Sequence, residues 1–204
     1  MTPHSGHDLI LATRNRGKVG ELITLLAGID VQVHSLLERS DISEVVEDGE
    51  TFEQNAVKKA VEIFRQTGMP ALADDSGLEV DALGLQPGVY SARYAGERVS
   101  YEENNRKLLA ELSGVPEGER IARFRCVVAF VGDGYRKVTE GICPGRIGLS
   151  LRGTNGFGYD PLFVPAGYSQ TFAELPLEIK NTISHRGLAL RRMIPHLREY
   201  FSAL

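Results

Sequence analysis

The chain has 204 residues, which suits one large domain or a core with a small lobe, and its 42% hydrophobic and 25% charged residues are ordinary for a globular protein. Its formal net charge of −4 argues against a general nucleic-acid binder, which would be basic. No apolar run approaches the ~20 residues that a transmembrane helix needs, so we expect no nucleic-acid partner and no membrane partner.

The cysteines and the first residues bear on the compartment. Cys126 and Cys143 are too few for a secreted disulfide framework, and neither has zinc-ligand spacing, although one disulfide would fit the count. Residues 1–8 lack the charged-then-apolar pattern of a signal peptide. We therefore expect a cytoplasmic protein in which residues 1–204 form a single domain and residues 1–8 are a frayed end.

Hydrophobic periodicity and stop signals predict α/β units in the first third of the chain. In chain order the expected elements are a strand at 9–12, a polar loop at 13–18, a helix at 19–28, a strand at 31–35, an acidic loop at 44–50 and a helix at 51–68. The last of these helices begins with capping-box spacing between Thr51 and Gln54.

The rest of the chain adds a second helix with a capping box and a hairpin. The expected elements are strands at 70–73 and 78–83, a helix at 100–114, strands at 120–131 and 135–142 around Gly132-Asp133-Gly134, a short strand at 161–164 and a last helix from Ser184. Pro195 should kink that helix or start a new one. Together these elements predict an α/β fold with a mixed sheet.

The most informative segment runs from Ala71 to Leu78, where a short apolar strand meets Asp74, Asp75, Ser76 and a glycine. Side chains alternate along a strand, so the two aspartates should point to opposite faces. Carboxylates at the C-terminal end of an α/β strand lie where ligands bind, and they suit Mg²⁺. A plain strand-to-turn junction is the alternative, because Asp, Ser and Gly are common turn residues.

A cationic loop precedes the first helix and is a candidate phosphate site. Its members are Thr13, Arg14, Asn15, Arg16, Gly17 and Lys18. Amide groups at a helix N-terminus and cationic side chains together favour an anion such as phosphate. The loop is not a Walker A motif, because Ala12 and Val19 replace the glycine and the hydroxyl which that pattern requires. A basic surface loop is the alternative interpretation.

Acidic residues gather ahead of the second helix. Complementarity with the helix dipole accounts for those from Asp48 to Glu53. Glu47 lies ahead of the cap and is a candidate metal ligand, with Glu44 as the runner-up.

Three further segments carry candidate binding residues. Gly156 to Pro161 places two aromatic rings between glycines, which suits stacking on a base or, equally, a turn with rings in the core. Arg186 offers a planar fork of donors, with His185 beside it and Lys180 a few residues earlier. Arg93 is either an exposed charge or a second phosphate contact. The sequence has no GxSxG elbow, no HExxH zinc motif and no plausible Ser-His-Asp or Cys-His set, so it does not indicate covalent catalysis by a nucleophile.

Six motifs in this order resemble the inosine triphosphate pyrophosphatase family (Ham1-like). They are Leu11-Ala12-Thr13-Arg14-Asn15-Arg16-Gly17-Lys18, Glu47-Asp48-Gly49-Glu50-Thr51-Phe52-Glu53-Gln54-Asn55-Ala56, Ala73-Asp74-Asp75-Ser76-Gly77-Leu78, Pro87-Gly88-Val89-Tyr90-Ser91-Ala92-Arg93-Tyr94-Ala95-Gly96, Gly156-Phe157-Gly158-Tyr159-Asp160-Pro161 and Ser184-His185-Arg186-Gly187. Each motif is weak alone, but the ordered set is specific and covers nearly the whole chain.

The resemblance implies a Mg²⁺-dependent hydrolase that converts ITP, dITP, XTP and dXTP to the monophosphate and pyrophosphate. It also implies an elongated mixed sheet with flanking helices, two lobes with a central substrate cleft, and a homodimer. A nucleotide-binding regulator without turnover and a Maf-type nucleotide diphosphatase are the alternatives. The retained acids Glu47, Asp74 and Asp75 argue against the regulator, and Ser184-His185-Arg186 argues against the Maf type.

The resemblance also assigns roles to residues. Asp75 would be the general base and, with Glu47, a metal ligand, and the triphosphate would bind the loop from Thr13 to Lys18. Further nucleotide contacts would come from Ser76, Arg93, Phe157, Gly158, Tyr159, Asp160, Lys180, His185 and Arg186. Arg186 would donate a hydrogen bond to the 6-oxo group of a purine. Adenine has an amino donor at that position, so Arg186 would disfavour adenine.

Two residues depart from the common pattern of the family. Arg14 replaces a glycine and adds a charge where the phosphates should pass. Leu85 replaces the second glycine of a Gly-Gly-x-Pro-Gly turn. Neither departure removes a chemical group that the mechanism needs.

Overall fold

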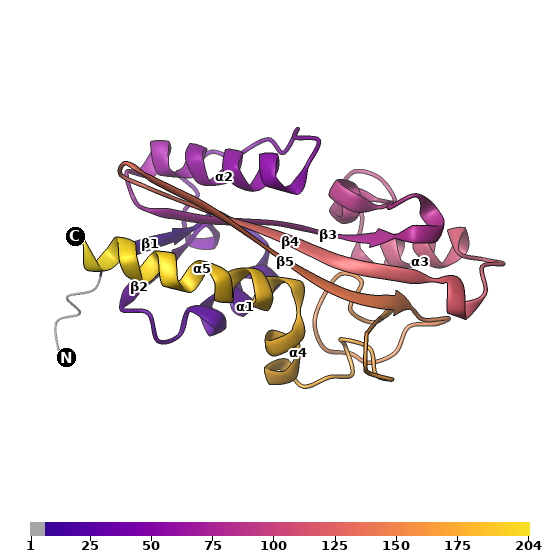
Figure 1. Cartoon of the computed structure of the whole chain (residues 1–204). Helices are drawn as coiled ribbons and strands as arrows, with labels where there is room; N and C mark the ends of the chain where they lie inside the picture. The colour runs from indigo at the N-terminus through magenta and orange to yellow at the C-terminus, as the bar shows by residue number, and fades with distance from the viewer. Residues whose placement is uncertain (1–6) are drawn as a thin grey trace. The chain divides into compact units, whose positions relative to one another are not determined.

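The computed structural model describes residues 7–204 and contains one mixed six-stranded sheet in the order β2-β1-β3-β4-β5-β6 (Figure 1). The strands are β1 (His7–Leu11), β2 (Val31–Ser35), β3 (Ala71–Val80), β4 (Ile121–Gly132), β5 (Tyr135–Ile147) and β6 (Phe163–Pro165). β1 runs parallel to β2 and β3, whereas β6 is antiparallel to β5. The predicted α/β class with a mixed sheet is confirmed.

The helices begin where the sequence supplies side-chain caps. They are α1 (Arg16–Leu26), α2 (Phe52–Thr67), α3 (Tyr101–Glu111), α4 (Leu177–Ile183) and α5 (His185–Ser202). Thr51 Oγ1 accepts the amide of Gln54 at the start of α2, and Gly68 ends that helix in the left-handed conformation. Ser100 and Glu103 form the predicted capping box of α3.

The chain folds into two compact units, each made of segments that are distant in the sequence. Unit 1 comprises Met1–Asp75, Val127–Glu140 and Leu188–Leu204, and unit 2 comprises Ser76–Cys126 and Gly141–Gly187. The expected single domain therefore stays a prediction. The predicted frayed end at residues 1–8 falls outside the described residues, except that His7 and Asp8 belong to β1.

Unit 1 is built on the parallel strands. Figure 1 shows α2 over one face of these strands and α1 with α5 over the other. The strand side chains of Leu9, Ile10 and Leu11 are fully buried, and so are Leu22 of α1 and Ile63 of α2. Because helices cover both faces of these strands, consecutive side chains of β1 from Leu9 to Leu11 are buried, and this stretch is continuously hydrophobic rather than alternating.

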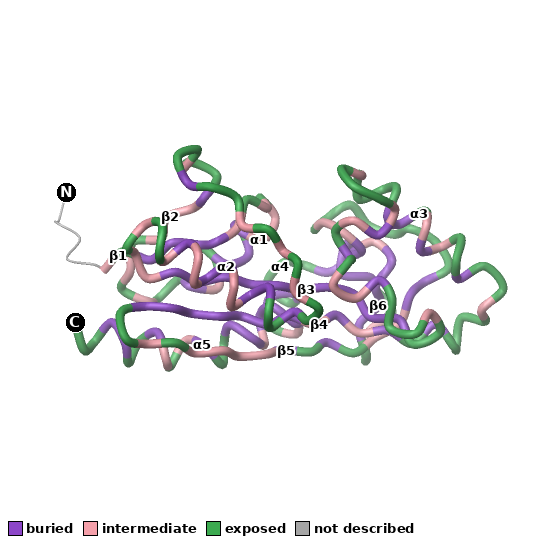
Figure 2. Tube along the Cα trace, turned by 90° about the horizontal axis from the view of Figure 1, so that it is seen from above, coloured by how far each residue is buried: buried purple, intermediate pink, exposed green. Residues whose placement is uncertain are grey.

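Unit 2 has its own apolar core against one face of β3, β4 and β5. Leu78, Phe124 and Phe163 belong to this core, together with Leu108 of α3. The rings of Phe124 and Phe163 lie 4.7 Å apart at a tilted angle, which is a favourable aromatic geometry. Figure 2 shows that β3 and β4 carry the longest buried stretches of the trace.

The prediction of two strands flanking the acidic pair is wrong. Asp74 and Asp75 lie in the middle of one ten-residue strand, β3, rather than at a strand end. The strand passes through Ser76 because the polar side chains find partners on the flanking helices. The expected second strand stops at Val80, and a short 3₁₀ turn (Asp81–Leu83) follows before Gly84.

Other boundaries also differ. The predicted polar loop at 13–18 ends at Asn15, which caps α1, so residues 16–18 form the first helical turn. α4 was not predicted, and it has no side-chain cap. α5 continues through Pro195 rather than restarting there. Cys126 and Cys143 are both buried and free.

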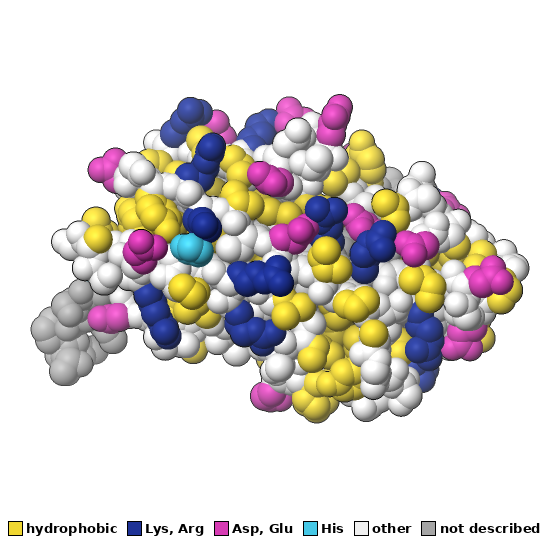
Figure 3. All heavy atoms as spheres, viewed as in Figure 1, with side chains coloured by type: hydrophobic (Ala, Val, Ile, Leu, Met, Phe, Trp, Pro, Cys, Tyr) yellow, Lys and Arg dark blue, Asp and Glu magenta, His cyan; other side chains and the backbone are white. Residues whose placement is uncertain are grey.

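None of the helices within residues 7–204 has both the length and the apolar character to cross a bilayer. On the face drawn in Figure 3, acidic and basic side chains are interspersed.

Candidate functional site

The two aspartates of β3 contact different helices of unit 1. Asp74 Oδ2 lies 3.2 Å from Lys18 Nζ of α1, and Asp75 Oδ2 accepts a hydrogen bond of 3.1 Å from Asn55 Nδ2 of α2. Because α1 and α2 cover opposite faces of the strands (Figure 1), the predicted opposite orientation of the aspartates is confirmed. Both residues are buried, with 0% and 7% of their surfaces exposed.

A buried lysine joins Asp75 to the acidic loop. Lys59 Nζ lies 2.6 Å from Glu47 Oε2 and 3.6 Å from Asp75 Oδ1. We call Glu47, Asn55, Lys59 and Asp75 the acid–lysine cluster. Two carboxylates therefore converge on one cationic position, and Glu44, the runner-up ligand, is exposed.

The protonation of this cluster is set by burial and by mutual charge. Burial raises the pKa of the Asp75 carboxyl, although Lys59, Lys18 and the Asn55 amide act against the rise. For Lys59, burial alone would lower the pKa, but the fields of Asp75 and Glu47 outweigh it and the pKa is raised. The cluster therefore combines a firmly cationic lysine with a carboxyl that is more basic than usual.

Asn55 fixes the acidic loop to the cluster. Its Oδ1 accepts the amide of Gly49 at 2.8 Å, while its Nδ2 donates to Asp75. A Cβ at Gly49 would meet Asn55 Oδ1 at 2.7 Å, so the close approach depends on the glycine. The loop that carries Glu47 is thereby held at a defined distance from Asp75.

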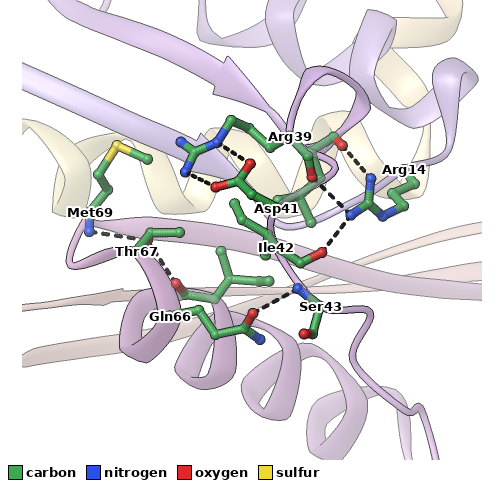
Figure 4. Close-up of polar contacts among 10 residues, drawn as sticks. Arg14, Arg39, Asp41, Ile42, Ser43, Gln66, Thr67 and Met69 are labelled. Atoms are coloured by element: carbon green, nitrogen blue, oxygen red, sulfur yellow. Dashed lines mark hydrogen bonds and ion pairs between the residues drawn. The ribbon is translucent and has the colours of Figure 1, made fainter.

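The cationic loop is ordered by its own side chains. Asn15 Oδ1 accepts the amide of Lys18 at 3.1 Å, and Thr13 Oγ1 accepts the amide of Asn15 at 3.2 Å. Arg14 turns to backbone carbonyls of the segment after β2, as Figure 4 shows. Arg16 is exposed in the first turn of α1. The loop thus leads into the N-terminus of α1, and Lys18 in the first turn of that helix forms an ion pair with Asp74.

Unit 2 holds a second group of predicted residues around an aromatic ring. Lys180 Nζ lies 5.1 Å from the centroid of Phe157 and Arg186 Cζ lies 5.6 Å from it. Lys180 also pairs with Asp160 Oδ2 at 2.5 Å, and Arg186 Nη2 donates to Ser76 Oγ at 2.9 Å. We call these five residues the Phe157 cluster. Lys180, Asp160 and Arg186 are each less than 4% exposed.

Several predicted binding residues have structural partners in unit 2. Tyr159 is buried in the core, and its hydroxyl donates to the carbonyl of Ser91 at 2.9 Å, which favours the core alternative for this ring. The His185 ring is buried and stacks on Phe124 with centroids 4.6 Å apart.

Gly158 and Arg93 lie elsewhere in this unit. The carbonyl of Gly158 accepts Asn105 Nδ2 at 3.0 Å. Arg93 lies over the Tyr90 ring and 3.9 Å from Glu97.

Asn55 and Lys59 were missed in the sequence, although a signal was present. They lie four residues apart on α2, on the same stripe as the buried Phe52, Ala56 and Ala60. Polar residues on the apolar face of an amphipathic helix need buried partners. That pattern points to a polar site under the helix.

Few oxygen ligands for a hard cation lie close together among the described residues. Within residues 7–204 no group of three or more His, Cys, Asp or Glu side chains is placed to hold a metal ion. Glu47 and Asp75 provide two carboxylates, which is the number that a magnesium site completed by water and phosphate oxygens uses.

This chain is similar to known proteins over almost its full length. The Ham1 family model matches residues 9–196. A dITP/XTP pyrophosphatase from Geobacter sulfurreducens is 54% identical over 190 residues, which cover 93% of this chain and 96% of that protein. A dITP/XTP pyrophosphatase from Lactiplantibacillus plantarum is 48% identical over 195 residues, covering 95% and 96%.

Solved structures share the fold. A HAM1 protein from Coxiella burnetii superposes with a TM-score of 0.85 at 39% identity and covers 95% of this chain and 99% of that chain. A nucleoside-triphosphatase (dITP/XTP pyrophosphatase) from Mycobacterium abscessus gives a TM-score of 0.72 at 44% identity, covering 92% and 99%.

Proposed function

Because the chain belongs to the Ham1 family, we propose that it hydrolyses the non-canonical purine nucleotides dITP, ITP, XTP and dXTP to the monophosphate and pyrophosphate. The observation that carries this proposal is the convergence of the Glu47 and Asp75 carboxylates on Lys59 Nζ. Removal of deaminated purines from the nucleotide pool is the physiological role that this activity would serve.

Mg²⁺ is the cofactor that we propose. Glu47 and Asp75 would hold it, since both carboxylates lie beside Lys59 and carboxylate oxygens suit this ion. When bound, the ion would offset phosphate charge and supply a Lewis acid. Lys59 would remain beside the carboxylates as a fixed positive charge.

In the proposed reaction the chain's own groups bind the triphosphate and activate water. Amides at the N-terminus of α1, together with Thr13, Asn15 and Lys18, would bind phosphate oxygens. Asp75 would accept the proton of the attacking water, a role that its raised pKa favours. Asn55 would keep the accepting carboxylate in orientation through its donor Nδ2.

The Phe157 cluster is our proposal for the base. The ring of Phe157 would stack on the purine, while Arg186, held by Ser76, would donate to the 6-oxo group. Adenine presents an amino donor at that position and would oppose Arg186. Within the cluster, Asp160 would hold Lys180, and His185, Tyr159 and Gly158 would support the cluster from outside. Arg93 would be a further phosphate contact.

The test is pyrophosphate release from dITP, XTP, dATP and dGTP with and without Mg²⁺. We expect at least about 100-fold preference for dITP and XTP over dATP, dependence on Mg²⁺, and a loss of about 10²- to 10⁴-fold in kcat for Asp75→Asn. Asp30→Asn, which changes an exposed aspartate, is the matched control and should retain activity.

The same assay separates the two alternatives. A regulator would bind dITP without releasing pyrophosphate, and a Maf-type enzyme would turn over other bases while leaving dITP and XTP intact. Equal turnover of dATP and dITP would refute the role given to Arg186. Full activity in Asp75→Asn would refute the proposed base.

We further propose that residues 1–204 act as one cytoplasmic Ham1-like domain that assembles as a homodimer. The single family match over residues 9–196 supports one domain, and the nucleotide pool as the substrate source supports the cytoplasm. Light scattering after size exclusion should give twice the mass of one chain.

A further inference from the structure

Arg14 is the residue at which this chain departs from the family's phosphate-loop pattern, and both terminal nitrogens of its guanidinium donate to backbone carbonyls. Nη1 donates to the carbonyl of Leu36 at 2.6 Å, and Nη2 donates to the carbonyls of Arg39 and Ile42 at 3.0 and 2.8 Å. Figure 4 shows the side chain pointing into the turn formed by these carbonyls. A guanidinium has a rigid planar set of donors that matches such an arrangement.

The turn that receives Arg14 is itself well defined. The carbonyls of Leu36 and Arg39 also accept the amides of Arg39 and Ile42, so the segment closes on itself. The side chains of Leu36 and Ile42 are 5% exposed and anchor it to the core. Its far end is fixed separately, because Gln66 Oε1 accepts the amide of Ser43 at 2.8 Å (Figure 4).

Arg14 immediately precedes Asn15, the cap of α1. Any restraint on residue 14 therefore restrains the cap and the first amides of the helix, which are the groups proposed to bind phosphate. Displacing these groups by a fraction of an ångström would weaken their contacts with phosphate, and the loss would appear in KM.

We propose that Arg14 is a positioning residue that clamps the loop of residues 13–18 to the segment of residues 36–42, and that it does not contact phosphate. This proposal rests on the proposed nucleotide hydrolysis and assigns a function to a residue that its charge alone would mark as a phosphate ligand. The clamp requires several donors in the fixed planar arrangement of a guanidinium, whereas a lysine can still supply a single charged contact to phosphate.

The discriminating experiment compares Arg14→Lys with Arg14→Gln. We expect KM for dITP to rise about 5- to 20-fold in both variants, with kcat changed less than about twofold, because both lose the three-carbonyl clamp. Retention of the wild-type KM in Arg14→Lys, with a raised KM in Arg14→Gln, would overturn the clamp in favour of a charge contact.

Amide hydrogen exchange in the nucleotide-free protein provides a readout that does not depend on activity. Peptides covering residues 13–18 and 36–42 should both exchange about tenfold faster in each Arg14 variant. Unchanged exchange in either segment would refute the link between them. If the wild-type protein released no pyrophosphate, the proposed function would fail while this measurement would still decide the clamp.

Gln66→Ala is the matched control, because it releases the other end of the same segment. It should speed exchange around Ser43 and leave exchange at residues 13–18 and KM unchanged. A rise in KM equal to that of Arg14→Lys would show that mobility of the segment, rather than the hold on the phosphate loop, sets KM, and would overturn the role of Arg14.

Discussion

Replacing Lys59 by Met tests whether the acid–lysine cluster depends on its buried cation. Lys59 lies between Glu47 and Asp75, whose side chains are 37% and 10% exposed, so the uncompensated charge left behind would be mainly that of Asp75. Removing one partner of a buried pair typically costs about 3–5 kcal/mol. Because Glu47 is partly solvated, we expect the lower end, about 3 kcal/mol, in urea unfolding at pH 7 with EDTA.

The destabilisation should depend on pH in a defined direction. The pKa of Asp75 is already raised, and Lys59 opposes the rise, so Lys59→Met should raise it further. The folded variant then binds a proton that the unfolded chain releases, and its stability increases as pH falls through that raised pKa toward the unfolded value of about 3.9. The difference from wild type should therefore be smaller at pH 5 than at pH 7.

In the wild-type protein, the raised pKa of Lys59 makes stability depend on pH in the alkaline range. Its contribution is fully present below the unfolded value of about 10.4 and is lost as pH rises through the higher folded value. Wild-type stability should fall in that alkaline range, and Lys59→Met should lack this component of the decline.

Two variants decide whether this reasoning is right. Lys58→Met is the matched control: Lys58 pairs with Asp48 at 2.6 Å, but both side chains are exposed, so the unfolding midpoint should hardly change. Adding Asp75→Asn to Lys59→Met removes the stranded charge and should recover most of the lost stability. Equal effects of Lys58→Met and Lys59→Met, or no recovery in the double variant, would refute the buried-charge argument.

Two further predictions concern backbone fit and a buried amide. A Cβ at Gly187 would meet the carbonyl of Asn181 at 1.9 Å, so Gly187→Ala should lower the free energy of unfolding by about 1–3 kcal/mol. Gly20 lies in the interior of α1 with open space around it, so Gly20→Ala should raise the free energy of unfolding by about 0.5–1 kcal/mol. Thermal unfolding measures both changes. Asn55→Ala leaves the Asp75 carboxylate without that donor and should lower the free energy of unfolding by about 2–3 kcal/mol; an unchanged urea midpoint would contradict the role given to the amide.

Local signals were sufficient where an element is specified by its own residues. The helix α2 begins and ends as predicted because Thr51 caps it and Gly68 adopts a positive φ of 69°. The Ser100 cap and the Gly132-Asp133-Gly134 turn likewise specify α3 and the β4–β5 hairpin. Short-range chemistry of this kind is visible in any single sequence.

Prediction failed where distant partners decide the conformation. Asp74, Asp75 and Ser76 have turn propensity, yet they continue β3 because Lys18, Asn55 and Lys59 satisfy the carboxylates across the sheet. A local pattern does not identify the partners in such contacts, because they lie far away in the sequence. Arg14 likewise meets distant partners, because its donors bind carbonyls within residues 36–42.

The Asn55 and Lys59 positions suggest how such sites could be recognised in a sequence. An amide and an amine on the buried stripe of α2 are unfavourable for folding unless acceptors lie opposite, and strand β3 supplies one in Asp75. A well-packed apolar pair would stabilise the same place at least as well. The presence of the polar set in this chain therefore argues for a requirement beyond stability. The activation of water that we propose for Asp75 is such a requirement, because it calls for a carboxyl of raised pKa beside a fixed cation.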